Sequence, residues 1–391
     1  MNLIIIADSY PPLNNSCAIQ IQDLANKFTE LGHNISIIIP GNVSKKYFHN
    51  ELKIFSIKVP EIRSKSYIVR TVFEFLMPYL MIQNLKKEKY LNDTYDGIIW
   101  YSPSIFFSPL IFFLKKKYNC RSYLILRDIF PKWAFDIGLI KSKFLYNFFC
   151  YIERNQYSAA DHIGVQTEGN LKYFYDNNYI KFTNISVLYN WLTPRKEMYI
   201  NIEAKIDFKD KTIFIYAGNM GKAQNMISLV KLAEKYDQES KVSFLFIGRG
   251  SEVKNLKSYA NMKKIKNIFF FDTIKPEELT SILNKCDVGM ISLNHKHKTH
   301  NIPGKFLSYL QAGLPVLADI NPNTDLERIM NENNLGSVST INNIQDLKNK
   351  ADQMINDLKT NNKVKENCKR AFFRLFSTEN TAKQIIKSII K

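Results

Sequence analysis

The sequence predicts an α/β protein made of two doubly wound domains. Strand-like apolar runs alternate with helical patterns almost throughout the chain, as in parallel sheets with crossover helices. A fresh series of strands begins after a polar, proline-containing segment at 191–210, and 391 residues are too many for one ordinary hydrophobic core. We therefore expect a first domain over 1–195, a second over 196–377, and a C-terminal helix over 378–391 that packs back on the first domain.

The first domain opens with a βαβ unit. Between its first two strand-like runs, Ile21, Leu24 and Phe28 recur at helical spacing, and Gly32 ends the pattern. The strands expected in this domain cover residues 3–7, 35–39, 97–101, 122–126, 162–166 and 185–188.

The second domain repeats the alternation of strands and helices. Its expected strands cover residues 212–216, 243–247, 267–271, 288–292 and 315–318. The last of these follows the stretch "NIPGKFLSYLQAG", which predicts a short helix that starts at Pro303 and Gly304 and stops at Gly313. The first-turn amides of a helix lack intrahelical partners, so together with Lys305 they favour an anion at this start.

Composition predicts a globular protein of a reducing cytoplasm. Hydrophobic residues make up 45% and charged residues 23% of the chain, and the five cysteines are scattered singly. The N-terminal "MNLIIIADSYPP" begins directly as a strand, so we expect no export signal. The longest apolar runs are shorter than the roughly 20 residues that span a bilayer, so we do not expect an integral membrane protein.

A net charge of +18 favours an anionic partner, either nucleic acid, phospholipid or a phosphorylated substrate. In the first half of the chain, lysine and arginine lie among large apolar residues at 63–90, 112–118 and 141–154. This mixture predicts peripheral contact with an anionic membrane surface rather than nucleic-acid binding. The alternative is that these are ordinary core helices with solvated lysine faces.

Glycine-containing turns follow three strands of the second domain. In "YAGNMGKAQ", Gly218 and Gly221 let the backbone approach a ligand closely, and Lys222 adds charge. The stretch matches neither G-x-x-x-x-G-K-[ST] nor the full dinucleotide fingerprint, and a plain turn between strand and helix is the alternative.

The next two turns offer groups for the rest of a nucleotide. Gly248 and Arg249 follow the second strand, and the planar guanidinium suits a diphosphate. Thr273 and Ile274 follow the third strand, where their backbone groups would meet a base.

Six stretches occur in order: "ADSYPP", "YAGNMGKAQ", "FIGRGSE", "FDTIKPEEL", "CDVGMISL" and "IPGKFLSYLQAGLPVLA". With them the chain resembles the family 4 retaining glycosyltransferases, over nearly its whole length. The resemblance implies a GT-B fold, in which two Rossmann-like doubly wound domains face a central cleft. "LRDIFPKWAFDIGLI" and "VLYNW" are similar to the branch that adds N-acetylated amino sugars or fucosamine-type sugars in bacterial O-antigen and capsule biosynthesis.

The resemblance implies that the second domain binds a nucleotide diphospho-sugar and the first domain binds the acceptor. Gly218, Asn219 and Lys222 would line the diphosphate loop, with Arg249 near the phosphates or base. Lys305 and the amides around Gly304 would meet the phosphates from the opposite side. These groups would neutralise the leaving diphosphate, so no metal or other cofactor is expected.

The chain departs from the family where its relatives carry two glutamates. His300 and Ser308 stand at these positions. The Ser308 hydroxyl would form a ribose hydrogen bond more weakly than a carboxylate, unless it is only a small residue on a packed helix. His295, His297 and His300 lie on a loop without acidic or cysteine neighbours, so we do not expect a metal site.

In the first domain, the neighbours Arg127 and Asp128 follow a strand. Asp128 would orient or deprotonate the acceptor hydroxyl, and Arg127 would pair with an acceptor diphosphate. A structural ion pair is the alternative.

The sequence therefore predicts a retaining glycosyltransferase that moves a sugar, expected to be an N-acetylated amino sugar, from a UDP-sugar to a lipid-diphosphate-linked saccharide. The expected location is the inner face of the cytoplasmic membrane, in O-antigen, capsule or lipopolysaccharide biosynthesis. A sugar-nucleotide epimerase or hydrolase of the same fold is one alternative, although such enzymes need carboxylates around the donor sugar. A non-catalytic partner subunit is the other.

Overall fold

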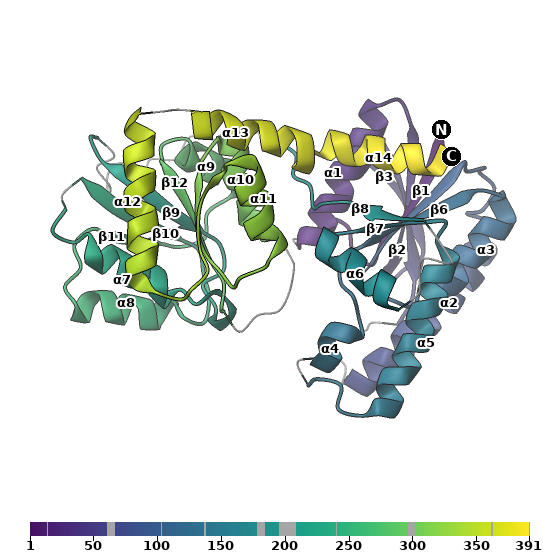
Figure 1. Cartoon of the computed structure of the whole chain (residues 1–391). Coiled ribbons are helices and arrows are strands. Elements are labelled where there is room, and N and C mark those ends of the chain that lie inside the picture. Colours follow the sequence, from purple (N-terminus) through teal and green to yellow (C-terminus); the bar gives the residue numbers. More distant parts are fainter. Residues whose placement is uncertain are drawn as a thin grey trace. The chain divides into compact units, whose positions relative to one another are not determined.

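Two compact units make up the chain in a computed structural model, one comprising Met1–Trp191 with Thr378–Lys391 and the other Leu192–Ser377 (Figure 1). The predicted site residue His300 and most of the segment at 191–210 lie outside the described residues. The structure describes residues 1–13, 15–60, 67–102, 104–136, 138–177, 184–194, 209–239, 241–295, 302–360 and 363–390.

The N-terminal unit is built on a sheet of order β3-β4-β2-β1-β5-β6-β7-β8. Neighbouring strands are parallel except for β3 and β4, which form an antiparallel hairpin. The strands are β1 (Asn2–Ile6), β2 (Asn34–Gly41), β3 (Lys45–His49), β4 (Leu52–Lys58), β5 (Gly97–Tyr101), β6 (Arg121–Leu126), β7 (His162–Val165) and β8 (Asn184–Val187).

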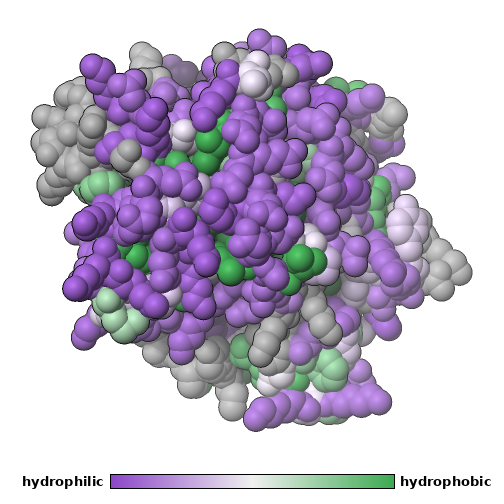
Figure 2. Space-filling model, turned by 60° about the vertical axis from the view of Figure 1, so that its left-hand side comes forward, coloured by the Kyte–Doolittle hydropathy of each residue, from purple (hydrophilic) through white to green (hydrophobic). Residues whose placement is uncertain are grey.

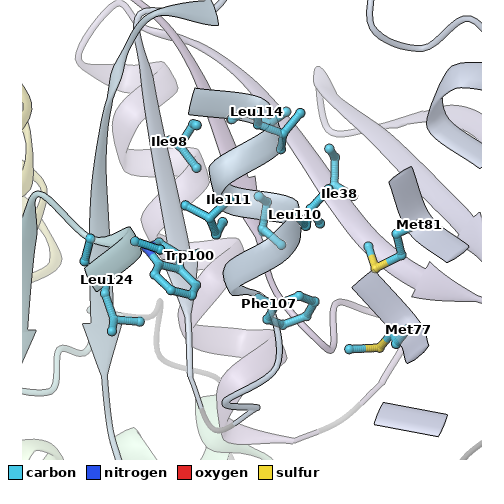
Figure 3. Packing of buried hydrophobic residues seen from close by; sticks show 14 of the residues in the cluster. Ile38, Met77, Met81, Ile98, Trp100, Phe107, Leu110, Ile111, Leu114 and Leu124 are labelled. Atoms are coloured by element: carbon cyan, nitrogen blue, oxygen red, sulfur yellow. The ribbon is translucent and has the colours of Figure 1, made fainter. Parts of the chain in front are cut away.

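Helices cover both faces of this sheet (Figure 1). On one face, Trp100 of β5 is completely buried beside side chains of α3, in a cluster that also contains Met77 and Met81 of α2 (Figure 3). On the other face α1 and α14 lie side by side. The helices are α1 (Ser16–Glu30), α2 (Tyr67–Lys87), α3 (Ser108–Tyr118), α4 (Lys132–Asp136), α5 (Lys143–Ala159), α6 (Glu168–Asp176) and α14 (Thr378–Ile390).

The C-terminal unit has an all-parallel sheet of order β11-β10-β9-β12-β13-β14. Both units are thus doubly wound α/β domains, which confirms the predicted fold class. The strands are β9 (Thr212–Ala217), β10 (Val242–Ile247), β11 (Ile268–Phe271), β12 (Val288–Ser292), β13 (Val316–Asp319) and β14 (Gly336–Ser339).

Most helices of the C-terminal unit connect consecutive strands. The exceptions follow β14 and lead back to the N-terminal unit through α14. The helical segments are η2 (Lys222–Gln224), α7 (Ile227–Lys235), α8 (Val253–Met262), α9 (Pro276–Leu283), α10 (Gly304–Ala312), α11 (Asp325–Asn333), α12 (Ile344–Thr360), α13 (Lys363–Ala371) and the π-helical η3 (Phe372–Phe376).

Three strands were not expected from the sequence. β3 and β4 form a hairpin whose turn residues Asn50 and Glu51 both have positive φ, at 48° and 67°. The usual sequence signal for such a turn is Asn-Gly, and glutamate stands in place of the glycine. β14 is the short polar run "GSVS", which lacks an apolar pattern.

The order of strands in the C-terminal unit reverses between β9 and β12, where doubly wound folds bind ligands. These two strands pair over only Phe214↔Val288 and Ile215↔Gly289. Beyond the pairs, the buried Tyr309 of α10 bridges the strands. Its hydroxyl accepts a hydrogen bond from the Ala217 amide at 2.9 Å and donates to the Met290 carbonyl at 3.2 Å.

We expect Gly289→Ala to destabilise the protein, because the added Cβ would lie 2.5 Å from the Tyr309 ring. Overpacking of this kind lowers the free energy of unfolding by about 1–3 kcal/mol. Chemical denaturation measures the loss. Gly304→Ala is the control, because its Cβ would meet no atom within 4 Å. Equal unfolding midpoints for the two variants would contradict the prediction.

Candidate functional site

A pocket of about 570 Å³ lies at the carboxyl ends of β9, β10 and β11. This volume is typical of sites for small molecules. We call it the donor pocket. It is lined by Ala217, Gly218, Asn219, Ile247, Gly248, Arg249, Thr273, Ile274, Leu279, Lys305, Ser308 and Tyr309.

The structure therefore brings most of the predicted donor-site residues into one pocket. Gly218, Asn219, Gly248, Arg249, Thr273, Ile274, Lys305 and Ser308 are the predicted residues that line it. Lys222, Pro303 and Gly304 are not among the lining residues, and Arg127 and Asp128 belong to the N-terminal unit.

Two glycine turns form part of the pocket wall as bare backbone. Gly218 and Gly248 have φ values of 135° and 141°, in the region that favours glycine. A Cβ on Gly248 would lie 2.0 Å from the Gly218 carbonyl oxygen. The turns are also hydrogen-bonded, because the Met220 amide donates to the Arg249 carbonyl at 2.8 Å. A side chain at Gly248 would therefore clash with the backbone of Gly218 and force the two turns apart.

Lys305 is a cation of the donor pocket whose position is fixed by contacts with Tyr216. Its Nζ donates to the Tyr216 hydroxyl at 2.6 Å and lies 4.0 Å from the centroid of the Tyr216 ring. Gly218 leaves room for this arrangement, since a Cβ there would lie 3.1 Å from Lys305 Cε. Burial lowers the pKa of Lys305 to about 7. An anion in the pocket would favour the charged ammonium.

Two tyrosines that the sequence analysis missed hold this arrangement. The buried Tyr216 donates its hydroxyl hydrogen to the Asn219 carbonyl at 2.6 Å, which leaves the hydroxyl oxygen to accept from Lys305. Tyr309, one helical turn after Lys305, anchors α10 to the sheet. Its i+4 spacing from Lys305 was an available signal that both side chains share one face of the helix.

The loop after β9 is held by Gln224. The side-chain oxygen of Gln224 accepts hydrogen bonds from the Gly221 amide at 3.0 Å and from Asn219 Nδ2 at 3.2 Å. Lys222 is exposed at the first position of η2. Arg249 is also exposed, at the rim of the donor pocket.

The predicted bounds of α10 are confirmed. The helix begins at Gly304, after Pro303 with φ −64° and ψ 136°, and no side chain caps it. Gly313 ends the helix with φ 75°, in the left-handed conformation. The exposed Gly304 leaves the start of the helix open to a ligand.

The histidine loop contributes one pair that the structure describes. His295 Nε2 lies 2.9 Å from Oδ1 of Asp319, whose side chain is almost completely buried. His297 and His300 lie outside the described residues. Within the described ranges, no three His, Cys, Asp or Glu side chains gather where a metal ion would bind.

Arg127 and Asp128 follow β6 in the N-terminal unit. Arg127 is only 8% exposed, and its Nη1 donates to the Leu188 carbonyl at 2.9 Å. The guanidinium also lies 4.8 Å from the Trp191 ring centroid. Asp128 is half-buried, and burial raises the pKa of its carboxyl while the neighbouring Arg127 lowers it. A raised pKa suits a carboxylate that accepts a proton.

A family model described as glycosyl transferases group 1 matches residues 200–371. These residues form a group 1 glycosyltransferase domain. The donor pocket lies entirely within this domain.

Two relatives of known name are glycosyltransferases by their descriptions. The chain is 26% identical over 232 residues to the probable glycosyltransferase WbjE of Pseudomonas aeruginosa, covering 54% of each chain. It is 21% identical over 228 residues to WcaI of Escherichia coli strain K12, a putative colanic acid biosynthesis glycosyl transferase, covering 56% of each chain. The matched region thus spans about half the length of these relatives.

Solved structures match the whole chain, including the group 1 domain. The Anabaena protein HepE in complex with UDP and glucose superposes with a TM-score of 0.66 at 11% identity, over 99% of both chains. This structural similarity shows that the chain has the GT-B fold.

We expect a diphosphate that binds beside Lys305 at pH 8 to cause uptake of a proton, with UDP as the probe. At pH 8 and without ligand, Lys305 is mostly neutral, because its pKa is about 7. A diphosphate beside it favours the charged ammonium, so binding adds a proton. The effect should fade below pH 7, where the lysine is already charged. Calorimetry in buffers of different ionisation enthalpy measures the uptake.

Lys305→Ala should abolish this proton uptake, and Lys231→Ala on the exposed surface of α7 should not. Equal proton uptake in wild type and Lys305→Ala would refute the assignment of the proton to Lys305.

Proposed function

We propose that this protein is a retaining glycosyltransferase of the family 4 type that uses a UDP-sugar as donor. The observation that carries the proposal is the donor pocket, where Lys305 faces the Gly218 turn inside a group 1 glycosyltransferase domain. HepE, a protein of the same fold, is in complex with UDP and glucose, which supports UDP as the nucleotide.

The diphosphate is proposed to lie between the Gly218 turn and the start of α10. Lys305 would contact it directly and Arg249 would reach it from the rim of the donor pocket, while Lys222 would approach from the exposed start of η2. As the bond from the anomeric carbon to the diphosphate breaks, negative charge grows on the leaving oxygen, and Lys305 stabilises that charge. The nucleoside then extends along α10, so that its ribose lies beside Ser308 and its base beside Thr273 and Ile274.

Asp128 of the N-terminal unit is proposed to orient the acceptor and to help remove its proton. The acceptor oxygen forms the new bond to the anomeric carbon while the bond to the diphosphate breaks, and no covalent enzyme intermediate is involved. Arg127 supports Asp128 from within the core rather than contacting the acceptor, because its guanidinium is buried against Trp191.

The acceptor is proposed to be a lipid-diphosphate-linked saccharide, and the sugar an N-acetylated amino sugar, as in O-antigen or capsule assembly. The colanic acid description of WcaI supports a role in surface polysaccharide biosynthesis.

The surface of the N-terminal unit supports peripheral membrane contact on the cytoplasmic side. Within the part of the chain that the structure describes, no helix is both long and apolar enough to cross a bilayer. Large apolar side chains are instead exposed on neighbouring elements, and we call this set the apolar patch. It comprises Val72, Phe75, Leu76 and Tyr79 of α2, Trp133 and Phe135 of α4, Leu139, and Phe144, Leu145, Phe148 and Tyr151 of α5.

A ring contact links α4 to α5, and another links α2 to Phe106, which shares a buried cluster with residues of α4 and α5. Phe75 lies 6.2 Å from Phe106, and Phe135 lies 4.4 Å from Tyr146, measured between ring centroids. The exposed Lys141 and Lys143 come just before Phe144, which is 84% exposed. Aromatic residues with lysines beside them suit the interface of an anionic bilayer. Figure 2 shows one face of the molecule, on which most of the residues drawn in colour are hydrophilic.

The central test separates donor binding from transfer. We expect Lys305→Ala to weaken UDP-sugar binding at least tenfold, because a hydrogen bond to a charged group contributes about 1.5–3 kcal/mol. Asp128→Asn should keep the donor affinity within about twofold and lower transfer to a lipid-diphosphate-linked saccharide by about 10²–10⁴-fold. Donor affinity is measured by calorimetry and transfer with radiolabelled UDP-N-acetylamino sugars.

Asp176→Asn is the control, because Asp176 is exposed at the end of α6. Turnover of the UDP-sugar at the same rate without any acceptor would favour an epimerase or hydrolase. No binding of any UDP-sugar would overturn the proposed function.

A second test concerns the membrane. We expect the double variant Leu139→Ser and Phe144→Ser to bind vesicles containing phosphatidylglycerol at least tenfold more weakly, since each large apolar side chain contributes about 1.5–3 kcal/mol when buried. Co-sedimentation with the vesicles measures binding. Met262→Ser, which changes an exposed residue of α8 in the C-terminal unit, should bind normally. The patch has no membrane role if the double variant sediments like wild type.

A further inference from the structure

A second pocket of about 270 Å³ adjoins the donor pocket inside the C-terminal unit. It lies between α9 and α10, and Leu279 and Ser308 line both pockets. We call it the α9–α10 pocket. Its other lining residues are Leu192, Thr193, Pro276, Thr280, Leu283, Asn284, Gln311, Ala312 and Lys369.

One face of α10 connects the two pockets. Lys305, Ser308 and Gln311 are spaced three residues apart and so lie in one row. Lys305 lines the donor pocket, Ser308 lines both pockets, and Gln311 lines the α9–α10 pocket. From Lys305 to Gln311 the helix axis rises by about 9 Å. A ligand extended along α10 therefore meets a cation first, then a hydroxyl and then an amide.

The polar groups at the far end of this row are available for a ligand. Within the described ranges, the Ser308 hydroxyl and the Gln311 amide make no hydrogen bond, although both side chains are half-buried. The Thr280 hydroxyl, by contrast, donates to the Pro276 carbonyl at 3.1 Å. The amide of Gln311 offers two donors and one acceptor, which match a pair of neighbouring hydroxyls.

We propose that Gln311 is a specificity residue for the ribose of the donor nucleotide. This inference rests on the proposed function, with the diphosphate at Lys305. The ribose lies one helical turn further along α10, beside Ser308, and its 2′- and 3′-hydroxyls point past Ser308 into the α9–α10 pocket. There they exchange hydrogen bonds with the Gln311 amide, while the base remains in the donor pocket. Ser308 lines both pockets, and its short side chain takes up little space where they adjoin.

The chemistry of the α9–α10 pocket fits hydroxyls better than a further phosphate. Lys369 is the cation among its lining residues, and it is exposed. Its aliphatic chain lies against Gly313, where a Cβ would be 2.8 Å from Lys369 Cε. The carbonyl end of α10 faces this region and disfavours an anion. Neutral groups that both donate and accept hydrogen bonds are the appropriate occupants.

The test compares UDP with 2′,3′-dideoxy-UDP by calorimetry on the full chain. Wild type should bind UDP at least tenfold more tightly, because neutral hydrogen bonds contribute about 1 kcal/mol each and two hydroxyls are recognised. Gln311→Leu, which keeps the size of the side chain, should weaken UDP binding at least tenfold and leave dideoxy-UDP binding unchanged. Gln345→Leu, at an exposed glutamine of α12, is the matched control and should leave both affinities unchanged.

A UDP preference that is the same in Gln311→Leu and wild type would overturn this inference and leave the proposed function standing. Failure of wild type to bind either nucleotide would overturn the proposed function itself. If Gln311→Leu does not fold, Gln311→Asn provides the same comparison with a smaller change. Its shorter amide should also lower the preference for UDP, and an unchanged preference would again overturn the inference.

Discussion

The donor pocket depends on one tyrosine hydroxyl at the point where two strands part. β9 and β12 pair over two residues and then separate, which opens the sheet for a ligand but leaves backbone groups without a ladder partner. The hydroxyl of Tyr309 satisfies two of these groups, because it accepts a hydrogen bond from the Ala217 amide and donates one to the Met290 carbonyl. A buried amide without a partner costs about 1–3 kcal/mol, so α10 has a strongly preferred position. Lys305 and Ser308 take their places in the pocket from that position, because they share a helix with Tyr309.

The same arrangement sets the charge of the pocket. Lys305 is half-buried and lies against an aromatic ring and a hydroxyl, neither of which carries the negative charge that would compensate an ammonium. Desolvation therefore works against the cation until an anion arrives. Such a site distinguishes ligands by charge as well as shape, because a neutral ligand would leave the desolvation of Lys305 uncompensated. The bare glycine turns opposite give a diphosphate room to approach.

The sequence was sufficient for features that depend on local pattern. Apolar runs followed by glycine located the strand ends of the donor pocket, and Pro303, Gly304 and Gly313 fixed the bounds of α10. Features that depend on tertiary contact were missed. Tyr216 and Tyr309 were not identified, because the sequence does not show which backbone groups a hydroxyl will meet. The burial of Arg127 was missed for the same reason, since its environment comes from Trp191, far along the chain.

The return of α14 to the N-terminal unit has a consequence for how the chain folds. Ile385 and Ile389 of α14 are buried in the core that contains β1 and α1, and Gly97 makes space for Ile389. The sheet of the N-terminal unit is complete in the first half of the chain, but one of its faces is only partly covered, by α1, until α14 has been synthesised. The C-terminal unit lies between the sheet of the N-terminal unit and α14 in the sequence, so it emerges from the ribosome before α14 does. Domains generally fold in the order of their synthesis. Here the unit that is begun first is finished last.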